Sequence, residues 1–191
     1  MENVLTEDEI KKLGFKHVGK DVAISKKASF YSPEKISIGN HVRIDDFCVL
    51  SGKIEIGDYV HVAVYSAIFG GDAGVWISDF CNISSRVVFY ALSDDFSGET
   101  MTSPLIPEKY KNVIQDKVVL EKHVVIGTSS VVLPGAYLAE GAAFGAFSLI
   151  KGKIDAWTIN AGIPCKKIKE RSRNVLKLEK KFVEERGGLN G

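Results

Sequence analysis

The chain has 191 residues, of which 45% are hydrophobic and 26% are charged, and its formal net charge is +1. This composition suits one soluble domain with a sizeable core, and the near-neutral charge argues against a nucleic-acid partner. No apolar run reaches the roughly 20 residues that cross a bilayer, and the start, MENVLTEDEIKK, is unlike a secretory signal. Three cysteines are an odd number, which argues against a disulfide framework. We therefore expect a cytoplasmic protein without a membrane or nucleic-acid partner.

The first predicted element is a short helix within TEDEIKKLGF. Thr6 is a typical N-cap residue, and Glu9 three positions later completes a capping box. Gly14 suits the left-handed residue that ends many helices. We expect residues 1–17 to form a helical cap.

An aliphatic residue then recurs at every sixth position, first without any slip at Ile38, Ile44, Leu50, Ile56, Val62 and Ile68. A helix repeats every 3.6 residues and a strand every 2, so six fits a short strand followed by a turn. The position four residues after each aliphatic is apolar or small, and the turn-forming residues Gly, Asp, Asn and Ser lie between. The register extends, with a few shifts, from Val18 to Ile150.

Such a repeat is typical of a parallel β-helix, in which three repeats close one coil and the aliphatic residues stack inside. We expect an all-β solenoid over residues 18–168. One long interruption, at about residues 91–117, breaks the repeat. Long irregular insertions are usually functional or disordered, and the apolar residues of this one indicate packing against something. These are Phe96, Met101, Leu105, Ile106 and Tyr110.

The last segment, residues 169–191, carries Val175, Leu178 and Phe182 at helical spacing. We expect a C-terminal helix and tail, with the helix lying on the last coil or on a neighbouring subunit.

The repeat resembles the hexapeptide-repeat acyltransferases. The segments VVIGTSSVVLPGAYLAEGAAFGAFSLIKG and INAGIPCKKIKER are similar to the C-terminal half of the galactoside, maltose and xenobiotic acetyltransferases, and the chain as a whole also resembles the nucleotide-sugar N-acetyltransferases. The resemblance covers roughly residues 18–171. It implies a left-handed parallel β-helix, acetyl-CoA as cosubstrate, and a homotrimer whose protruding loop helps to enclose sites between subunits. We expect no metal, because a metal site needs more clustered ligands than the sequence offers.

The position where that family carries a catalytic histidine falls here on Asp94, next to Asp95. O-acetylation of a hydroxyl needs a base that is active near neutral pH, and histidine suits this better than an aspartate with a reference pKa of about 3.9. An amine is the stronger nucleophile once it is neutral. The aspartates therefore favour N-acetylation of a nucleotide-linked amino sugar for surface polysaccharide (O-antigen or capsule). O-acetylation of a saccharide hydroxyl and a non-catalytic scaffold are the alternatives, and the two carboxylates could instead form turns.

Further candidates complete the predicted site. His61 and His123, both expected to face outward, could be a displaced base, and Tyr65, Asn82 and Ser93 could contact the acceptor sugar. The resemblance implies that coenzyme A runs along the C-terminal coils, with lysines as point charges for its phosphates. The residues expected beside it are Gly127, Ser130, Gly145, Ala146, Ser148, Ile163, Pro164, Lys166 and Lys167.

Overall fold

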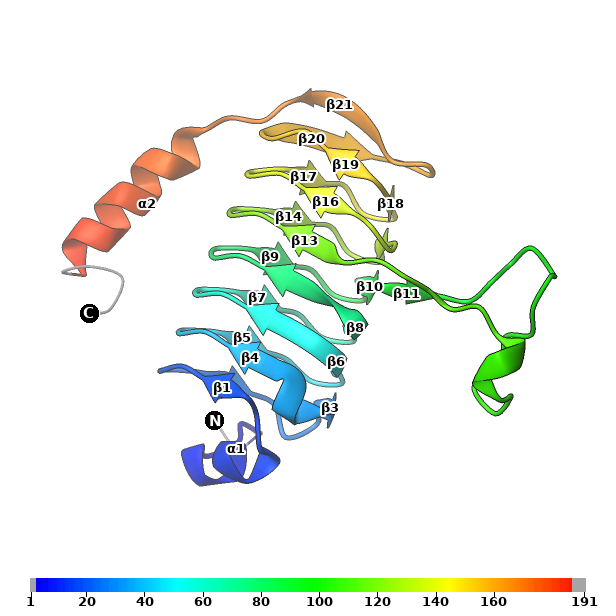
Figure 1. Ribbon diagram of the computed structural model, residues 1–191. Coiled ribbons are helices and arrows are strands. Elements are labelled where there is room, and N and C mark those ends of the chain that lie inside the picture. The colour runs from blue at the N-terminus through cyan, green and yellow to red at the C-terminus, as the bar shows by residue number, and fades with distance from the viewer. Residues whose placement is uncertain (1–2, 187–191) are drawn as a thin grey trace.

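The computed structural model describes residues 3–186. It shows a solenoid of stacked parallel coils with a helix at each end and an arm that leaves the solenoid at mid-height (Figure 1). Three strands separated by turns make one coil, so the solenoid has three faces. Face 1 is an eight-stranded sheet whose last strand is antiparallel to its neighbour, while the preceding strands are parallel. Faces 2 and 3 form one 11-stranded sheet, because two long strands continue from one face to the other. The predicted β-solenoid is confirmed.

The strands of face 1 are β2 (Ala23–Ile24), β5 (Arg43–Ile44), β7 (His61–Val62), β9 (Asn82–Ile83), β14 (Val125–Ile126), β17 (Ala143–Phe144), β20 (Thr158–Ala161) and β21 (Lys166–Glu170). Face 2 contains β3 (Ser29–Tyr31), β10 (Val88–Tyr90), β15 (Val131–Val132) and β18 (Leu149–Ile150). Face 3 contains β1 (His17–Val18), β4 (Ile36–Ile38), β13 (Val118–Leu120), β16 (Tyr137–Leu138) and β19 (Lys153–Ile154). The strands shared by faces 2 and 3 are β6 (Val49–Ile56) and β8 (Ala67–Ile77).

The turns between faces form three edges. Edge 1 joins face 1 to face 2 and includes residues 45–48, 63–66, 84–87, 127–130 and 145–148. The turn at residues 162–165, which connects β20 to β21, lies against the end of this edge, where the Leu149 N–H donates to the Gly162 carbonyl at 3.0 Å. Edge 2 joins face 2 to face 3, and the arm leaves from it. Edge 3 joins face 3 to face 1 and includes residues 39–42, 57–60, 78–81, 121–124 and 139–142. A short 3-10 turn, η1 (Pro33–Lys35), accounts for the extra residues before Ile38.

The predicted inward aliphatics form the core. Leu50, Ile68 and Phe89 are fully buried and pair in register from coil to coil. Cys48 and Cys81 lie in the same core, where burial raises the pKa of their thiols to about 11 and about 12. Because the thiolate is the reactive form, both cysteines are structural.

Edge 3 carries a ladder of stacked aromatic rings. His41 stacks on Tyr59 at 4.5 Å between ring centroids, Tyr59 on Phe80 at 5.0 Å, and Phe80 on His123 at 5.4 Å. Each is the third residue of its turn and has a φ between +55° and +61°, a region that bulky residues rarely occupy. The spacing follows from the sheet, since neighbouring strands lie about 4.8 Å apart. Stacking therefore offsets part of the backbone strain at these four turns.

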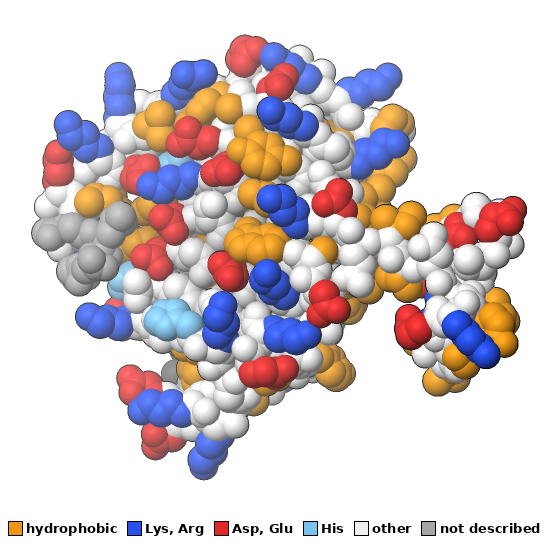
Figure 2. Space-filling view, in the orientation of Figure 1, with side chains coloured by type: hydrophobic (Ala, Val, Ile, Leu, Met, Phe, Trp, Pro, Cys, Tyr) orange, Lys and Arg blue, Asp and Glu red, His pale blue; other side chains and the backbone are white. Residues whose placement is uncertain are grey.

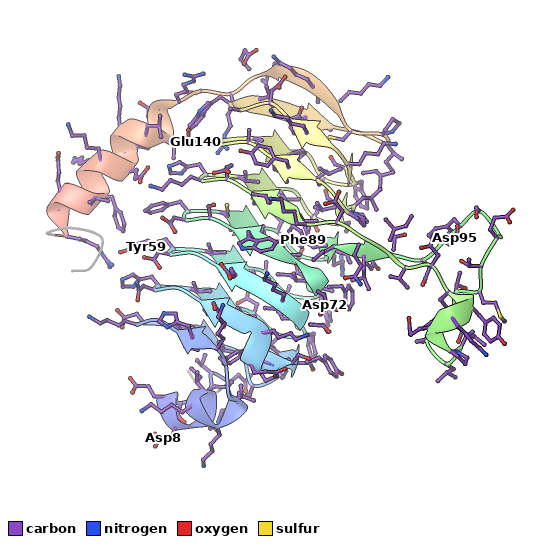
Figure 3. The ribbon with its side chains drawn as sticks, viewed as in Figure 1. Asp8, Tyr59, Asp72, Phe89, Asp95 and Glu140 are labelled. Atoms are coloured by element: carbon purple, nitrogen blue, oxygen red, sulfur yellow. The ribbon has the colours of Figure 1, made fainter. Side chains whose placement is uncertain are left out.

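The first and last elements of the described chain are helices. The capping box of α1 (Glu7–Leu13) is present, with Thr6 and Glu9 each accepting a hydrogen bond from the other's backbone, and Gly14 has a φ of 74°. α2 (Asn174–Glu185) does not lie on the last coil, as one of the two predicted placements had it. It runs back along edge 3, where Phe182 packs edge-on against Tyr59 at 5.3 Å (Figures 1 and 3). The predicted tail from residue 187 onward lies outside the described residues. No helix within residues 3–186 is long and apolar enough to span a bilayer.

The arm is an antiparallel pair of short strands, β11 (Leu92–Ser93) and β12 (Ile114–Gln115), that carries an irregular tip with the 3-10 turn η2 (Glu108–Tyr110). The tip stands clear of the solenoid (Figure 2). Phe96 and Leu105 are 92% and 91% exposed. The partner that these apolar residues were expected to pack against is therefore not supplied by the described part of the same chain.

The ladder packing makes a stability prediction. Ile68→Ala opens a cavity between Leu50 and Phe89, and we expect it to lower the free energy of unfolding by about 2–5 kcal/mol. Ile114→Ala, in the arm, is the control because that side chain is 54% exposed, and it should change the free energy by less than about 0.5 kcal/mol. Chemical denaturation measures both. Equal effects of the two substitutions would contradict the assignment of Ile68 to the core.

Candidate active site

A cavity of about 1060 Å³ lies where the arm meets edge 2 of the solenoid. We call it the arm cavity. Its solenoid wall includes Phe69 and Tyr90, whose rings stack at 5.3 Å, and the turn beginning at Leu133. Its arm wall is more polar. The arm residues that line it are Leu92, Ser93, Asp94, Phe96, Thr102, Pro104, Glu108, Lys111, Val113 and Gln115.

Two of the predicted acceptor-site residues, Ser93 and Asp94, line this cavity. The Ser93 hydroxyl donates to the backbone carbonyl of Asp94 at 3.1 Å. Within residues 3–186 the Asp94 carboxylate has no hydrogen-bond or ion-pair partner, so it is free to meet a ligand. No histidine is among the residues that line the cavity.

Asp95 has a different environment. Its carboxylate accepts hydrogen bonds from the Ser97 backbone N–H and the Thr100 hydroxyl, both at 2.8 Å. These bonds hold its pKa below the ordinary value. Asp95 does not line the arm cavity, and its bonds are those of a turn-forming aspartate. In Figure 3 it lies out on the arm, away from the solenoid. The Asp94 carboxylate is therefore available in the cavity, whereas the Asp95 carboxylate stabilises a turn of the arm.

The predicted histidines lie elsewhere. His61 faces outward from β7, and its Nε2 lies 2.8 Å from Oδ2 of Asp45, which also accepts a 2.7 Å hydrogen bond from Arg43. Burial alone would raise the pKa of Asp45, but the bonds from Arg43 and His61 outweigh it and lower that pKa. Asn82 is the residue in register with His61 on the next coil. This group lies on face 1, not at the arm cavity.

His123 differs most from expectation. It lies outside the core, as predicted, but it is not open to solvent, since only 3% of it is exposed. α2 covers it, and Nε2 lies 2.7 Å from Oε2 of Glu179 while Lys122 Nζ lies 2.6 Å from Oε1. His123 was expected to face outward, but the sequence does not show which edge the C-terminal helix covers.

Tyr65 lies on edge 1 and is half exposed, stacked on Phe47 at 5.0 Å with the Arg86 guanidinium 6.0 Å from its ring centroid. A single chain therefore does not bring together the predicted acceptor residues. Ser93 and Asp94 belong to the arm, Tyr65 to edge 1, and His61 and Asn82 to face 1.

The predicted donor residues from Gly127 to Ser148 lie on edge 1, whereas Lys166 and Lys167 lie on β21 of face 1. Edge 1 positions of successive coils stack directly, with Gly127 N–H donating to the Phe144 carbonyl and Gly145 N–H to the Asn160 carbonyl. A Cβ on Gly127 would lie 2.6 Å from the Ala146 nitrogen, so only glycine fits there. Ala146 is exposed on this edge, as is Ile163 in the turn at its end, and Pro164 follows.

The serines and lysines that were predicted to lie beside coenzyme A differ in the accessibility of their side chains. Ser130 and Ser148 are buried, and both hydroxyls donate to the Gly145 carbonyl, so their side chains are not available to a ligand. Lys166 and Lys167 are exposed on β21, where Lys167 pairs with Glu170. Lys166 has no such partner within residues 3–186. Among the described residues, no group of three or more His, Cys, Asp or Glu side chains could hold a metal ion.

Several lining residues of the arm cavity were missed at the level of sequence. Phe69 and Tyr90 each follow an inward residue, Ile68 and Phe89, by one position, so strand alternation already places both outward on face 2. That signal was available. No comparable sequence signal exists for Lys111 and Gln115, because the arm lies outside the six-residue repeat.

Comparison with known proteins completes the picture. No protein-family model matches the sequence. A dTDP-4-amino-4,6-dideoxy-D-glucose acyltransferase from Escherichia coli is 52% identical over 181 residues, which is 93% of this chain and 94% of that protein. The putative lipopolysaccharide biosynthesis O-acetyl transferase WbbJ of Escherichia coli strain K12 is 30% identical over 156 residues, 77% of this chain and 74% of that protein. The crystal structure of AntD, an N-acyltransferase from Bacillus cereus in complex with dTDP and 3-hydroxybutyryl-CoA, matches with a TM-score of 0.95 and 50% identity over 98% of this chain and 100% of that chain.

The solenoid, its protruding arm and these relatives define an acyltransferase of the hexapeptide-repeat type, as the repeat predicted. More narrowly, the chain belongs to the family of dTDP-4-amino-4,6-dideoxyglucose acyltransferases. Since the close relatives are enzymes, the alternative of a scaffold without turnover is set aside.

Glu179 lies on the side of α2 that faces edge 3, where it bonds to Lys122 and His123, and this position makes a prediction about pH. Burial alone would raise its pKa, but hydrogen bonds from Lys122 and His123 outweigh burial and lower it. A lowered folded-state pKa means that the carboxylate stabilises the fold above its ordinary pKa of about 4.3, and that this contribution is lost as the pH falls through the folded-state value. We expect Glu179→Gln to cost about 1–2 kcal/mol of unfolding free energy at pH 7, with the difference from wild type narrowing below about pH 4.3.

Glu184→Gln is the matched control, because Glu184 pairs with Lys180 on the exposed side of the same helix. It should have little effect. Thermal unfolding across pH 3–8 measures both variants. If Glu179→Gln were as stable as wild type at pH 7, α2 would not be held by this carboxylate.

Proposed function

We propose that the protein transfers an acetyl group from acetyl-CoA to the amino group of a nucleotide-linked amino sugar of the dTDP-4-amino-4,6-dideoxyglucose class, in the cytoplasm, for surface polysaccharide synthesis. The observation that carries this proposal is the free Asp94 carboxylate in the arm cavity, in a chain half identical to AntD. The name of WbbJ supports the link to lipopolysaccharide.

Asp94 suits an amine acceptor. A sugar amine enters largely as an ammonium ion, which a carboxylate attracts, and it must lose a proton before it can attack a thioester. Asp94 binds the ammonium and takes its proton or passes it to water. The bound acyl-CoA supplies the activated acyl thioester. A hydroxyl acceptor would need a stronger base, and the cavity has no histidine to offer one.

Solved structures of AntD point to the same residue and to a second one. They include its S84A variant with dTDP-4-amino-4,6-dideoxyglucose and coenzyme A, and its D94N variant with dTDP and coenzyme A. This chain has Ser84 and Asp94 at the same numbers. Ser84 begins an edge 1 turn, whereas Asp94 lies in the arm cavity at edge 2. A site that uses both residues therefore draws them from two copies of the chain.

We propose a homotrimer on this basis, with three sites that each combine the arm of one copy with edge 1 of the next. Closed rotational symmetry is usual for such assemblies. The exposed Phe96 and Leu105 of the arm, and the exposed Phe47, Tyr65 and Phe147 of edge 1, are the apolar surfaces that this arrangement would cover.

The donor is proposed to lie along edge 1 toward the C-terminal coils. The small residues Gly127, Gly145 and Ala146 leave backbone accessible beside a pantetheine arm, Ile163 and Pro164 offer an exposed surface for adenine, and the unpaired Lys166 suits a phosphate. Lys167 would have to exchange Glu170 for a phosphate.

The first test is catalytic. Wild type should release free thiol from acetyl-CoA with dTDP-4-amino-4,6-dideoxyglucose, assayed beside 3-hydroxybutyryl-CoA as donor. Asp94→Asn should lower kcat/KM by roughly 10²–10⁴-fold, and the loss should shrink as pH rises because more acceptor arrives neutral. Asp95→Asn is the control, since it weakens a turn but leaves the cavity carboxylate. Full activity of Asp94→Asn would refute the assigned role.

One observation favours O-acetylation as a second candidate. The His61 imidazole is held by Asp45, an arrangement typical of general-base catalysis, and the side chain is 40% exposed. In the same assay, activity on a saccharide hydroxyl that is lost in His61→Ala and kept in Asp94→Asn would select this alternative.

The second test concerns the shared site. Asp94→Asn removes the arm carboxylate, and Ala146→Trp blocks edge 1, so each homotrimer should be inactive. Co-expression should restore activity, because a mixed trimer contains sites with an intact arm from one chain and an intact edge from another. Differently tagged chains allow the mixed trimers to be purified and assayed. Mixed trimers as inactive as their parents would place the whole site within one chain.

A further inference from the structure

Lys111 is an unusual lysine for an exposed arm. Its side chain is only 7% exposed, although most residues around it are open to solvent. Its one ion-pair partner within residues 3–186 is Glu108, 2.6 Å away, whose own side chain is 85% exposed. Lysine usually keeps its ammonium in water, and burying a charge is costly unless it is well paired. The neighbouring Lys109 behaves in the ordinary way, with its ammonium 4.8 Å from the exposed Tyr110 ring centroid.

The local backbone holds Lys111 in this place. Lys111 is the C-cap residue of the 3-10 turn η2, and its N–H donates to the Glu108 carbonyl at 3.0 Å. Met101 on the opposite leg of the arm pairs with Lys111 in a backbone bridge. These contacts hold the main chain at Lys111, whose side chain is a lining residue of the arm cavity.

The charges in the cavity form a pattern. Among the described residues that line it, those with a formal charge at neutral pH are Asp94, Glu108 and Lys111, and Lys111 is the one cation. A nucleotide-linked amino sugar carries a positive ammonium at one end and a negative diphosphate at the other. Asp94 matches the ammonium, and a lysine with three donors and a single carboxylate partner matches the diphosphate.

We infer that Lys111 binds the diphosphate of the acceptor, and that Glu108 occupies its ammonium until the phosphate replaces it. This inference rests on the proposed function, because it takes the arm cavity as the acceptor site. It adds a residue that orients the acceptor, so that the sugar amine points to Asp94. Glu108 then acts as a competitor of the ligand, and its removal should favour binding.

The experiment measures the binding of dTDP to the intact protein by calorimetry, with no acyl donor present. Lys111→Met keeps an unbranched apolar side chain and removes the charge, and we expect dTDP affinity to fall about ten- to hundredfold, as for a lost hydrogen bond to a charged group. Glu108→Gln should bind dTDP as tightly as wild type or more tightly. Lys109→Met is the matched control and should bind like wild type.

Thymidine, which has no phosphate, separates charge recognition from damage to the arm. Its affinity should not change in Lys111→Met. The inference is overturned if Lys111→Met binds dTDP like wild type, if it loses thymidine and dTDP equally, if Glu108→Gln binds dTDP more weakly than wild type, or if wild type binds none of dTDP, UDP and GDP.

Failure of the proposed function gives a different result. Wild type would then bind dTDP with the predicted dependence on Lys111, yet transfer no acyl group to the amino sugar. Conversely, acyl transfer that proceeds with an unchanged acceptor KM in Lys111→Met would retain the proposed function and remove Lys111 from it.

Discussion

The hydrogen bonds between coils hold equivalent residues about one strand spacing apart, and the rest of the molecule depends on this constraint. Every position repeats as a ladder, so a residue that suits one coil must also suit the coils above and below it. The constraint produces the aliphatic core, the stacked rings of His41, Tyr59 and Phe80, and the glycine at 127, where the next coil leaves no room for a Cβ. Irregular structure has no place inside such a stack. The chain can form it only by leaving the solenoid, which the arm does at edge 2.

The regular solenoid and the irregular arm offer different kinds of binding groups. The edges offer backbone groups and small residues in a straight line, which suits a long, extended donor. The arm offers individually placed charges, because no repeat dictates its residues. Asp94 and Asp95 are adjacent in sequence, yet Asp94 lines the cavity whereas the Asp95 carboxylate accepts a hydrogen bond within a turn. The proposed shared site combines the arm and edge 1 from different copies of the chain.

The C-terminal helix decides which surface remains available. By running back along edge 3, α2 covers His123 and ties it to Glu179. The aromatic ladder there is thus partly closed by Phe182 from the same chain. Face 1 at His61 and the exposed rings of edge 1 stay open. The helix therefore buries one candidate base, His123, and leaves face 1, edge 1 and the arm cavity uncovered.

The sequence by itself determined the solenoid, the inward and outward positions, the N-terminal capping box and the line of small residues along edge 1, because each of these depends on local geometry that recurs every six residues or within one turn. It also marked Asp94 through its place in the repeat. Only the tertiary structure decided that the Asp95 carboxylate bonds within its own turn and that the Ser130 and Ser148 hydroxyls donate to a neighbouring carbonyl. It also decided that α2 buries His123 and that Lys111 lines the arm cavity. These outcomes depend on contacts between segments far apart in the chain or within an irregular arm, and no periodicity in the sequence encodes them.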